Sequence, residues 1–411
     1  MLLGRNKSII TPNIPCSLAG FAHRSGKAKE KYDELYLRTT LLQDGDTILC
    51  FVVADIIWWD DDLIEMLKKR ISKEENIPEK NLYFSATHSH SGPQVSKRFS
   101  KELGEYDENF TSQLIKKTCK SVKKSKENLQ YVTTLVRKTK IDLGVYRRKL
   151  VKNIVEMAPN ESVEIDNDLT VVSFINKQNI EIATWIHYAC HPTSTDANII
   201  SGEFPGVCTA NLEIKNDQCI VSFFQGFSAD VRPKLVKDNK FYRGSLEEMI
   251  SIGNYLYNEV ELLKKEPCVH EKKINLKVME TSVPLTYDDQ ELNIDTSISL
   301  QEEWKWKKEQ HQIEQLNFSY IVISENLSLL LANAEMTQDY GRILKNMDKS
   351  ILPIAYSNGM IGYIATKKQL ENGGYEAETS IYYFSIKGKL HVEMEEKIKR
   401  KFYKLKENNH A

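Results

Sequence analysis

The sequence predicts a mixed α/β (α+β) protein in which layered β-sheets are covered by helices. Two observations lead to this fold class. Short β-rich runs alternate along the chain with segments whose apolar residues recur every three to four positions. The 411 residues are 41% hydrophobic and 27% charged, which is enough apolar material for a large core without disulfides or structural metals. We therefore expect one large domain.

Each predicted element follows from its own pattern. Runs of apolar and β-branched residues, bounded by polar or turn residues, predict strands at 48–57, 82–86, 131–136, 170–175 and 182–189. Helical periodicity predicts helices at 62–73, 108–129, 206–215, 246–265, 300–316 and 390–406. The main domain is predicted to span 1–385, with a possible insertion at 270–315. Residues 386–411 are expected to form a basic, solvated C-terminal helix.

Composition excludes several classes of protein. Lys and Arg total 56 against 57 for Asp and Glu, so nothing in the charge favours nucleic acid or an anionic membrane as a partner. No run of eighteen apolar residues occurs, so we expect no stable membrane insertion. The opening MLLGRNKSIITPNIP has too short an apolar stretch for a signal peptide, and the seven cysteines are scattered without a C-x-x-C pair. We expect a cytoplasmic protein with reduced cysteines. Its oligomeric state is left open.

Histidines gather at the ends of two predicted strands. NLYFSATHSHSGP places His88 and His90 after one strand, and ATWIHYACHPTS places His187 in a second strand with His191 at its end. Extended residues two apart share a side, so His88 and His90 can face one centre. Neutral imidazole is a good zinc ligand, which makes these strand ends candidates for a metal site. We interpret His187 instead as a hydrogen-bonded core residue.

Both of these motifs belong to a longer series. Residues 86–93 read ATHSHSGP, and six segments follow: ACHPTS (189–194), SGEFPGVCTANLE (201–213), QGFSADVRP (225–233), ANAEMT (332–337), IGYIAT (361–366) and GGYEAETS (373–380). In sequence and in order these resemble the motifs of the neutral, non-lysosomal ceramidase family, whose hallmark is A-T-H-[ST]-H-S-G-P. The resemblance implies a zinc hydrolase that cleaves an amide bond.

The resemblance also implies which residues form the site. Matched motif by motif, the ligands of one Zn²⁺ per chain would be His88, His191, Glu335 and Tyr363. Two imidazoles and a carboxylate leave room for a water whose pKa the ion lowers. Without the resemblance, Tyr363 would be taken for a core residue.

Three more residues receive roles close to the reacting bond. His90 matches the family residue beside the metal water, where an imidazole can act as a general acid or base. Arg147 matches an arginine that contacts the substrate near its carbonyl, although the neighbouring Arg148 leaves the register open. Tyr375 is a candidate substrate-binding phenol. Asp55 is expected to cap or orient a neighbour. Glu203 and Asp230 could each cap a helix or turn or touch the substrate, and the sequence leaves both roles open.

The chain departs from the family in its expected substrate contacts. Arg232 stands where the family has a serine, and arginine cannot act as a nucleophile or a general base. Tyr146 and Phe227-Ser228-Ala229 replace other family residues, whereas Gln225 is kept as a candidate substrate contact. Family members are longer, with a signal peptide and a C-terminal β-sandwich that helps at membranes. We therefore expect a small, polar substrate, and hypothesise that Arg147 and Arg232 bind a carboxylate or phosphate.

Three functions compete at this stage. The first is a metal-dependent hydrolase of C–N bonds, acting on an N-acyl amine, an N-acetylated sugar or a related small amide. The second is an esterase or sugar deacetylase with the same metal centre. The third is a non-catalytic protein that binds a metal or ligand. The complete set of His88, His90, His191, Glu335 and Tyr363 favours an enzyme. The sequence leaves open the substrate and whether the metal is zinc, iron, manganese or nickel.

Overall fold

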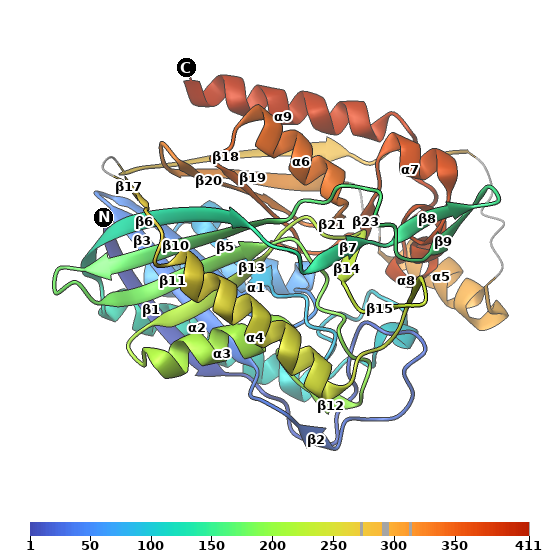
Figure 1. The fold of residues 1–411 in the computed structure, drawn as a ribbon, viewed down its shortest axis with the longest axis horizontal. Coiled ribbons are helices and arrows are strands. Elements are labelled where there is room, and N and C mark those ends of the chain that lie inside the picture. The colour runs from blue at the N-terminus through green and yellow to red at the C-terminus, as the bar shows by residue number, and fades with distance from the viewer. Residues whose placement is uncertain (272–273, 290–295, 312–314, 411) are drawn as a thin grey trace.

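The chain folds into four stacked layers. The computed structural model describes residues 1–271, 274–289, 296–311 and 315–410, with side chains up to residue 407. Figure 1 shows a large sheet packed face to face with a smaller one, helices below the large sheet, and two helices above the smaller one. This confirms the expected layered α/β class.

The large sheet has nine strands. Its order is β13-β11-β10-β6-β1-β3-β4-β5, and β17 pairs with β6 off this path. The strands are β1 (Leu2–Ile9), β3 (Tyr36–Asp44), β4 (Thr47–Ala54), β5 (Leu82–Ala86), β6 (Gln130–Lys140), β10 (Asp168–Asn176), β11 (Glu181–Tyr188), β13 (Ile220–Gln225) and β17 (Val269–Glu271). The β4–β5 and β11–β13 pairs are parallel, and the other pairs are antiparallel.

The smaller sheet was not foreseen. It has the order β18-β19-β20-β22 and is formed by β18 (Ile274–Pro284), β19 (Gln315–Ser324), β20 (Leu327–Ala332) and β22 (Ile351–Ile354). Apolar side chains from the facing sides of the two sheets form one core cluster, in which Phe51 and Trp185 meet Ile321 and Leu329. Burial of this contact holds the two sheets together.

Helices cover the outer faces of both sheets. On the large sheet, α1 (Asp61–Glu75) and α2 (Glu108–Glu127) pack over β3 and β4, and α3 (Glu203–Lys215) and α4 (Leu246–Leu263) pack over β11 and β13. On the smaller sheet lie α6 (Gln338–Met347) and α9 (Met394–His410). The basic C-terminal helix is present, but one face of it is buried. Phe402 packs on Phe318 with ring centroids 5.2 Å apart, so α9 is part of the packed molecule.

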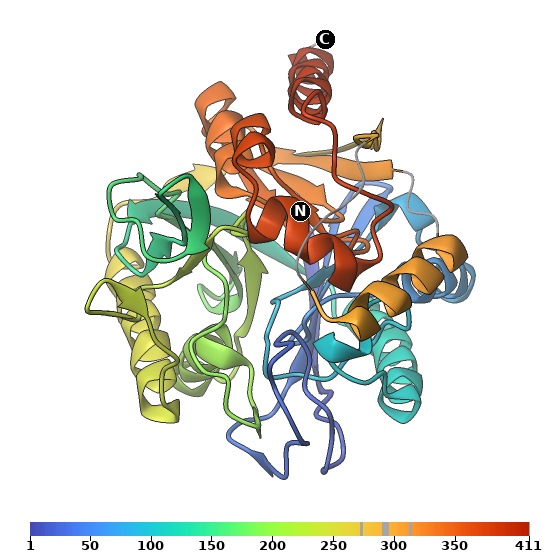
Figure 2. The same cartoon turned by 90° about the vertical axis from the view of Figure 1, so that its right-hand side faces the viewer.

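Short elements gather at one end of the sheets, the end that faces the viewer in Figure 2. They are the two-stranded pairs β2 (Glu30–Lys31) with β12 (Ile199–Ile200), β7 (Gly144–Tyr146) with β14 (Val231–Pro233), β8 (Arg148–Val151) with β9 (Ile154–Met157), β15 (Val236–Lys237) with β16 (Lys240–Phe241), and β21 (Glu335–Met336) with β23 (Tyr363–Ile364). The helices α5 (Ile298–Gln310), α7 (Lys367–Asn372) and α8 (Ser380–Phe384), a π-helical turn (Tyr375–Thr379) and two 3₁₀ turns (Glu79–Asn81, Lys101–Leu103) complete the described elements.

The large sheet curls back on itself. Phe51 of β4 contacts Trp185 of β11 and Phe224 of β13, with ring centroids 5.0 and 6.4 Å apart. Each step between neighbouring strands rotates a sheet by roughly 20–25°, so over many steps its two edges turn toward each other. As a result, β13 touches β5 across the sheet. This curl brings together the segments that follow β5 and β11.

Most predicted elements are confirmed, with one correction. The predicted helix at 300–316 is too long: α5 ends at Gln310, residues 312–314 lie outside the described structure, and Leu316 belongs to β19. Leu316, Phe318 and Tyr320 alternate as in a strand and are buried. The possible insertion at 270–315 contains β18 and α5, with 272–273, 290–295 and 312–314 outside the described residues. Its status as an insertion, and the boundary at 385, stay predictions.

Candidate metal centre and its cavity

Two histidine-bearing loops meet at the curled end of the large sheet. His88 follows β5 and His191 follows β11, and their Nε2 atoms lie 3.1 Å apart. The Nε2 atom of His90 lies 3.2 Å from that of His88. The expected convergence of His88 and His90 is present, but its expected cause is wrong. The chain is not extended here, because His88 has a φ of 64°, and this left-handed residue turns the loop so that both rings face one point.

Backbone carbonyls fix the tautomer of two of these rings. The Nδ1–H of His88 donates to Ile57 O at 2.8 Å, and that of His191 donates to Ser228 O at 3.0 Å. A carbonyl oxygen can only accept, so the proton of each neutral ring sits on Nδ1 and Nε2 carries a lone pair. This arrangement is typical of metal-ligating histidines.

A carboxylate and a phenol complete the group. β21 and β23 pair in parallel, with Glu335 directly beside Tyr363. Glu335 Oε2 lies 3.4 Å from His191 Nε2 and 3.7 Å from His88 Nε2. Tyr356, whose ring stacks on His88 at 3.8 Å, donates its hydroxyl to the same oxygen at 3.3 Å. The structure thus brings together all four predicted ligands.

These donors fit a divalent metal ion. Two bare Nε2 atoms 3.1 Å apart repel each other unless a proton or a cation lies between them. Burial lowers the pKa of His88 to about 3, so an added proton is disfavoured there. Burial also raises the pKa of Glu335 to about 8, which means that its carboxylate needs a cation to stay charged near neutral pH. His88, His90 and His191 form a buried cluster that could hold a metal ion.

A small cavity of about 160 Å³ opens onto this cluster. His90, His191, Glu335 and Tyr363 form its floor, and aromatic and basic side chains form its walls. The described wall residues include Phe21, Trp58, Arg147, Arg232, Arg243, Tyr375, Tyr383 and Phe384. A water molecule occupies about 30 Å³ of liquid, so the enclosed space suits a group of only a few heavy atoms.

The register between the two adjacent arginines is resolved. Arg147 lines the cavity and its Nη2 lies 3.3 Å from the hydroxyl of Tyr363. Arg148 points away from the cavity and donates to Gly373 O at 2.7 Å. Both guanidinium groups form ion pairs with Glu376, Arg147 through Nε at 2.7 Å. Glu376 was not singled out from the sequence, although it follows Tyr375 in the motif GGYEAETS.

Gln225 does not reach the cavity, contrary to its predicted role in substrate binding. Its side chain is fully buried, and its Nε2 donates to Cys190 O at 2.8 Å and to Ser228 Oγ at 2.6 Å. Ser228 is the residue whose carbonyl fixes His191. Gln225 therefore positions the loop that orients a metal ligand, and has no surface left to offer a substrate.

Several other residues singled out from the sequence have structural partners. His187 is a core histidine whose Nε2 donates to Pro353 O at 2.7 Å. Asp55 pairs with Arg38 at 2.8 Å, and Asp230 accepts from the backbone of Gln338 at 2.8 Å. Glu203 accepts from three backbone N–H groups, those of Ser194, Thr195 and Phe204. All seven cysteines are free in the structure.

Comparison with known families identifies the chain. The model of the neutral/alkaline non-lysosomal ceramidase N-terminal domain matches residues 1–239, more than half of the sequence. The protein belongs to this ceramidase family. Curated proteins yield no match to the chain.

Solved ceramidases share the whole fold. The structure of neutral ceramidase from Pseudomonas aeruginosa superposes with a TM-score of 0.77 at 14% identity, covering 98% of this chain and 73% of that one. A structure described as a ceramidase complexed with C2 gives a TM-score of 0.75 at 14% identity, covering 97% and 73%. The ceramidase fold therefore continues through the smaller sheet, beyond the residues that the family model matches. Within the described residues of this ceramidase-family chain, no helix is long and apolar enough to cross a bilayer.

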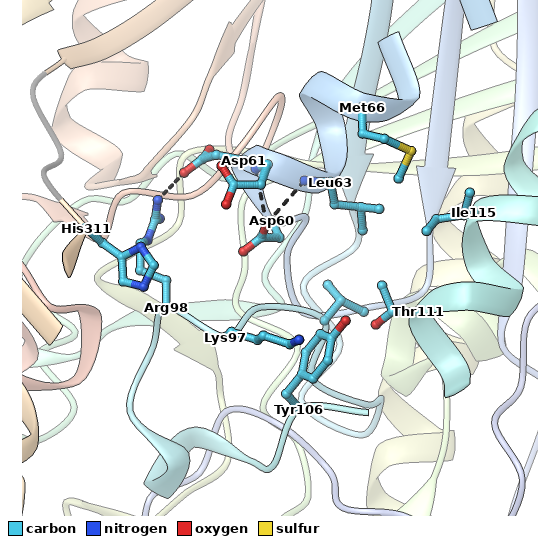
Figure 3. Close-up of a pocket in the computed structure, with 12 residues that line it drawn as sticks. Asp60, Asp61, Leu63, Met66, Lys97, Arg98, Tyr106, Thr111, Ile115 and His311 are labelled. Atoms are coloured by element: carbon cyan, nitrogen blue, oxygen red, sulfur yellow. Dashed lines mark hydrogen bonds and ion pairs between the residues drawn. The ribbon is translucent and has the colours of Figure 1, made fainter. Parts of the chain in front are cut away.

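A second, larger cavity of about 580 Å³ lies at the start of α1 (Figure 3). Several of its charged groups are engaged by neighbours: Arg98 forms an ion pair with Asp61, and Asp60 caps α1 and accepts from Ser96 Oγ at 2.5 Å. Lys97 lies 4.6 Å from the centre of the Tyr106 ring. None of the three clustered histidines lines this cavity. The candidate site of this ceramidase-family protein is therefore the smaller cavity.

Proposed function

We propose that this protein is a zinc-dependent amidohydrolase of a small, polar N-acyl substrate. The observation that carries the proposal is the pair of bare Nε2 atoms of His88 and His191, held 3.1 Å apart beside Glu335 at the floor of a small cavity. The ligands would be His88, His191, Glu335 and Tyr363. A bound zinc ion would activate water near neutral pH and polarise the scissile carbonyl.

The protein's own groups supply the remaining chemistry. His90 is a neutral imidazole, because burial and then the neighbouring rings of His88 and His191 hold its pKa well below the ordinary value. Its Nε2 faces the cluster and can take up the proton of the attacking water, then return it to the leaving amine. Arg147 is held by Glu376, so its remaining N–H groups can bind the oxygen on which negative charge develops.

The size of the cavity supports a small substrate. Phe21, Trp58 and Tyr375 line the cavity with apolar surface. An enclosed space of about 160 Å³ is below the roughly 300–1,000 Å³ of sites that engulf drug-sized ligands. It accommodates an acetyl or similarly short acyl group.

Metal content decides the first part of the proposal. The wild type is expected to hold about one zinc ion per chain, and His191→Ala to lose it. His270→Ala, which alters an exposed histidine on β17, is the matched control and should keep the metal. Wild-type protein that stays metal-free after reconstitution would overturn the proposal and favour a ligand-binding protein.

Substrate assays decide the second part. We expect turnover of short N-acyl amides, little turnover of ceramide vesicles, and a kcat for His90→Ala reduced by about 10²–10⁴ with its zinc retained. Loss of zinc in His90→Ala would instead make His90 a ligand and contradict its role as the base. Turnover of matched esters but of no amide would replace the amidohydrolase by an esterase.

A further inference from the structure

The wall of the cavity carries more positive than negative charge. Arg147 and Arg148 share one carboxylate, Glu376. Arg243 lies 3.7 Å from Asp196, a carboxylate that His23 also contacts. Arg232 forms no ion pair with any residue that the structure describes, so its charge is left without a counter-ion.

Arg232 is nevertheless buried. Only 5% of its surface is exposed, and its Nε has no hydrogen-bond partner. Burial, together with repulsion from Arg243 and Arg147, lowers its pKa to about 9. The nearby carboxylate of Glu203 does not pair with it, because its oxygens accept from the backbone of Ser194, Thr195 and Phe204. A buried cation in this state is costly unless an anion joins it.

Aromatic rings hold the arginines in place and leave their donors free. The guanidinium of Arg232 lies 4.6 Å from the centre of the Phe241 ring, and that of Arg243 lies 4.6 Å from the centre of the Phe21 ring. In such a stack the ring covers one face of the guanidinium, while its N–H groups stay available for planar, bidentate contact. Phe21 also packs on His90, with ring centroids 4.7 Å apart. The ring that stacks on Arg243 therefore also contacts the histidine cluster.

The fold places these arginines in the same cavity as the candidate metal ligands. Arg232 lies on β14, whose partner strand β7 leads directly into Arg147. Arg243 follows the β15–β16 hairpin, which is anchored where Gly244 N donates to Ser194 O at 2.8 Å. Both Arg232 and Arg243 line the same small cavity as His90 and His191.

We propose that Arg232 and Arg243 form an anion subsite that binds a carboxylate or phosphate group on the non-reacting part of the substrate. The substrate is then an anionic amide, of which an N-acyl amino acid is the simplest form. The subsite rests on the cavity alone, whereas its link to an amide substrate rests on the proposed function. Each guanidinium group can form two parallel, charge-assisted hydrogen bonds with such an anion, and these bonds would distinguish it from a neutral group.

Anion binding is measured first, without turnover. The protein carries His191→Ala so that no hydrolysis occurs, and calorimetry follows inorganic phosphate, N-acetylglycine and the neutral N-acetylglycinamide. Both anions should bind at least about tenfold more tightly than the neutral amide. Adding Arg232→Gln should remove that preference, and Arg232→Lys should keep part of it. Lys237→Gln removes a charge from the exposed side of the neighbouring hairpin, and should have no effect.

The outcomes separate the two proposals. Anion affinity that is unchanged in Arg232→Gln, with native near-ultraviolet circular dichroism, overturns the anion subsite. In the zinc-loaded enzyme, Arg232→Gln should raise KM for N-acetylglycine about tenfold and leave that for N-acetylglycinamide unchanged. Anion binding that depends on Arg232 in a protein that turns over no amide keeps the subsite and overturns the proposed hydrolase.

Discussion

Arg232 is a buried cation that forms no ion pair with any described residue. A buried, unpaired cation destabilises a folded protein, and replacing such a group by an apolar side chain of similar length is neutral or stabilising. In buffer without polyvalent anions, Arg232→Met should therefore raise the free energy of unfolding by about 1 kcal/mol or more, because methionine can keep the contact with Phe241. Denaturant unfolding measures this difference. Lys237→Met is the control, and a clear loss of stability in Arg232→Met would show that the charge is compensated.

Asp230 predicts a dependence of stability on pH. Burial raises its pKa from 3.8 to about 7 in the folded protein. Between these values the folded chain holds a proton that the unfolded chain has released. The stabilising contribution is complete below about pH 3.8 and is lost as pH rises through about 7, with a slope of up to about 1.4 kcal/mol per pH unit. Asp230→Asn should reduce the slope by this contribution in unfolding measurements between pH 5 and 8, whereas a substitution of the exposed Asp142 by Asn should leave the slope unchanged.

Single residues also show the limit of sequence reasoning. Residue patterns pointed to His88 and His191 at strand ends, whereas Glu335 and Tyr363 joined them only through the resemblance to the ceramidase motifs. The patterns did not reveal that Gln225 turns away from the cavity or that Tyr356 stacks on His88. Both depend on the direction of a side chain, which is set by tertiary packing and leaves no periodic signal.

At the scale of elements, the π-helical turn at Tyr375–Thr379 holds the arginine pair through Glu376. The Glu376 carboxylate is buried and is the shared counter-ion of Arg147 and Arg148. Glu376→Gln leaves both buried guanidinium groups without their shared counter-ion. The substitution should therefore lower the free energy of unfolding by about 3–5 kcal/mol.

Glu378→Gln lies on the same turn and is the matched control. Its carboxylate is half-buried and pairs with Lys389 at 2.9 Å, so its loss should cost less than about 1 kcal/mol. Equal effects of the two substitutions in chemical denaturation would contradict a special role for Glu376.

The elements that the sequence predicted share a clear local signal. The predicted strands of the large sheet, β4, β5, β6, β10 and β11, contain apolar runs, and α1, α2 and α4 have a well-marked apolar face. β1, β3, β13 and β17 were not predicted. The smaller sheet escaped prediction because β18 is largely exposed along one side. The separate β21–β23 pair escaped prediction because each of its strands has only two residues. A strand of two residues has no periodic pattern of its own and exists only through its hydrogen bonds to a partner strand. Glu335 and Tyr363 become neighbours only through pairing across the chain.

At the scale of the whole molecule, the candidate metal centre joins two parts of the fold. His88 and His191 follow strands of the large sheet, whereas Glu335 follows β20 of the smaller sheet. An ion bound to all of them stabilises only the complete fold. At 100 times its dissociation constant it adds about 2.7 kcal/mol.

Removal of the metal should therefore destabilise both sheets together. Chelation is expected to lower Tm by several degrees in one cooperative transition, and calorimetry measures it. His191→Ala should already melt at the lower temperature and should not respond to the chelator. Two separate transitions after chelation would mean that the sheets unfold independently.

The spacing of the ligands has a consequence for how the protein is made. They are spread from position 88 to position 363, and the last of them lies on β23. While a ribosome is still extending the chain, the histidines can emerge and β5 and β11 can pair, but the carboxylate and phenol are not yet available. With the proposed ligand set, metal binding would therefore follow synthesis of the smaller sheet, and a nascent chain halted before β23 would lack the complete site.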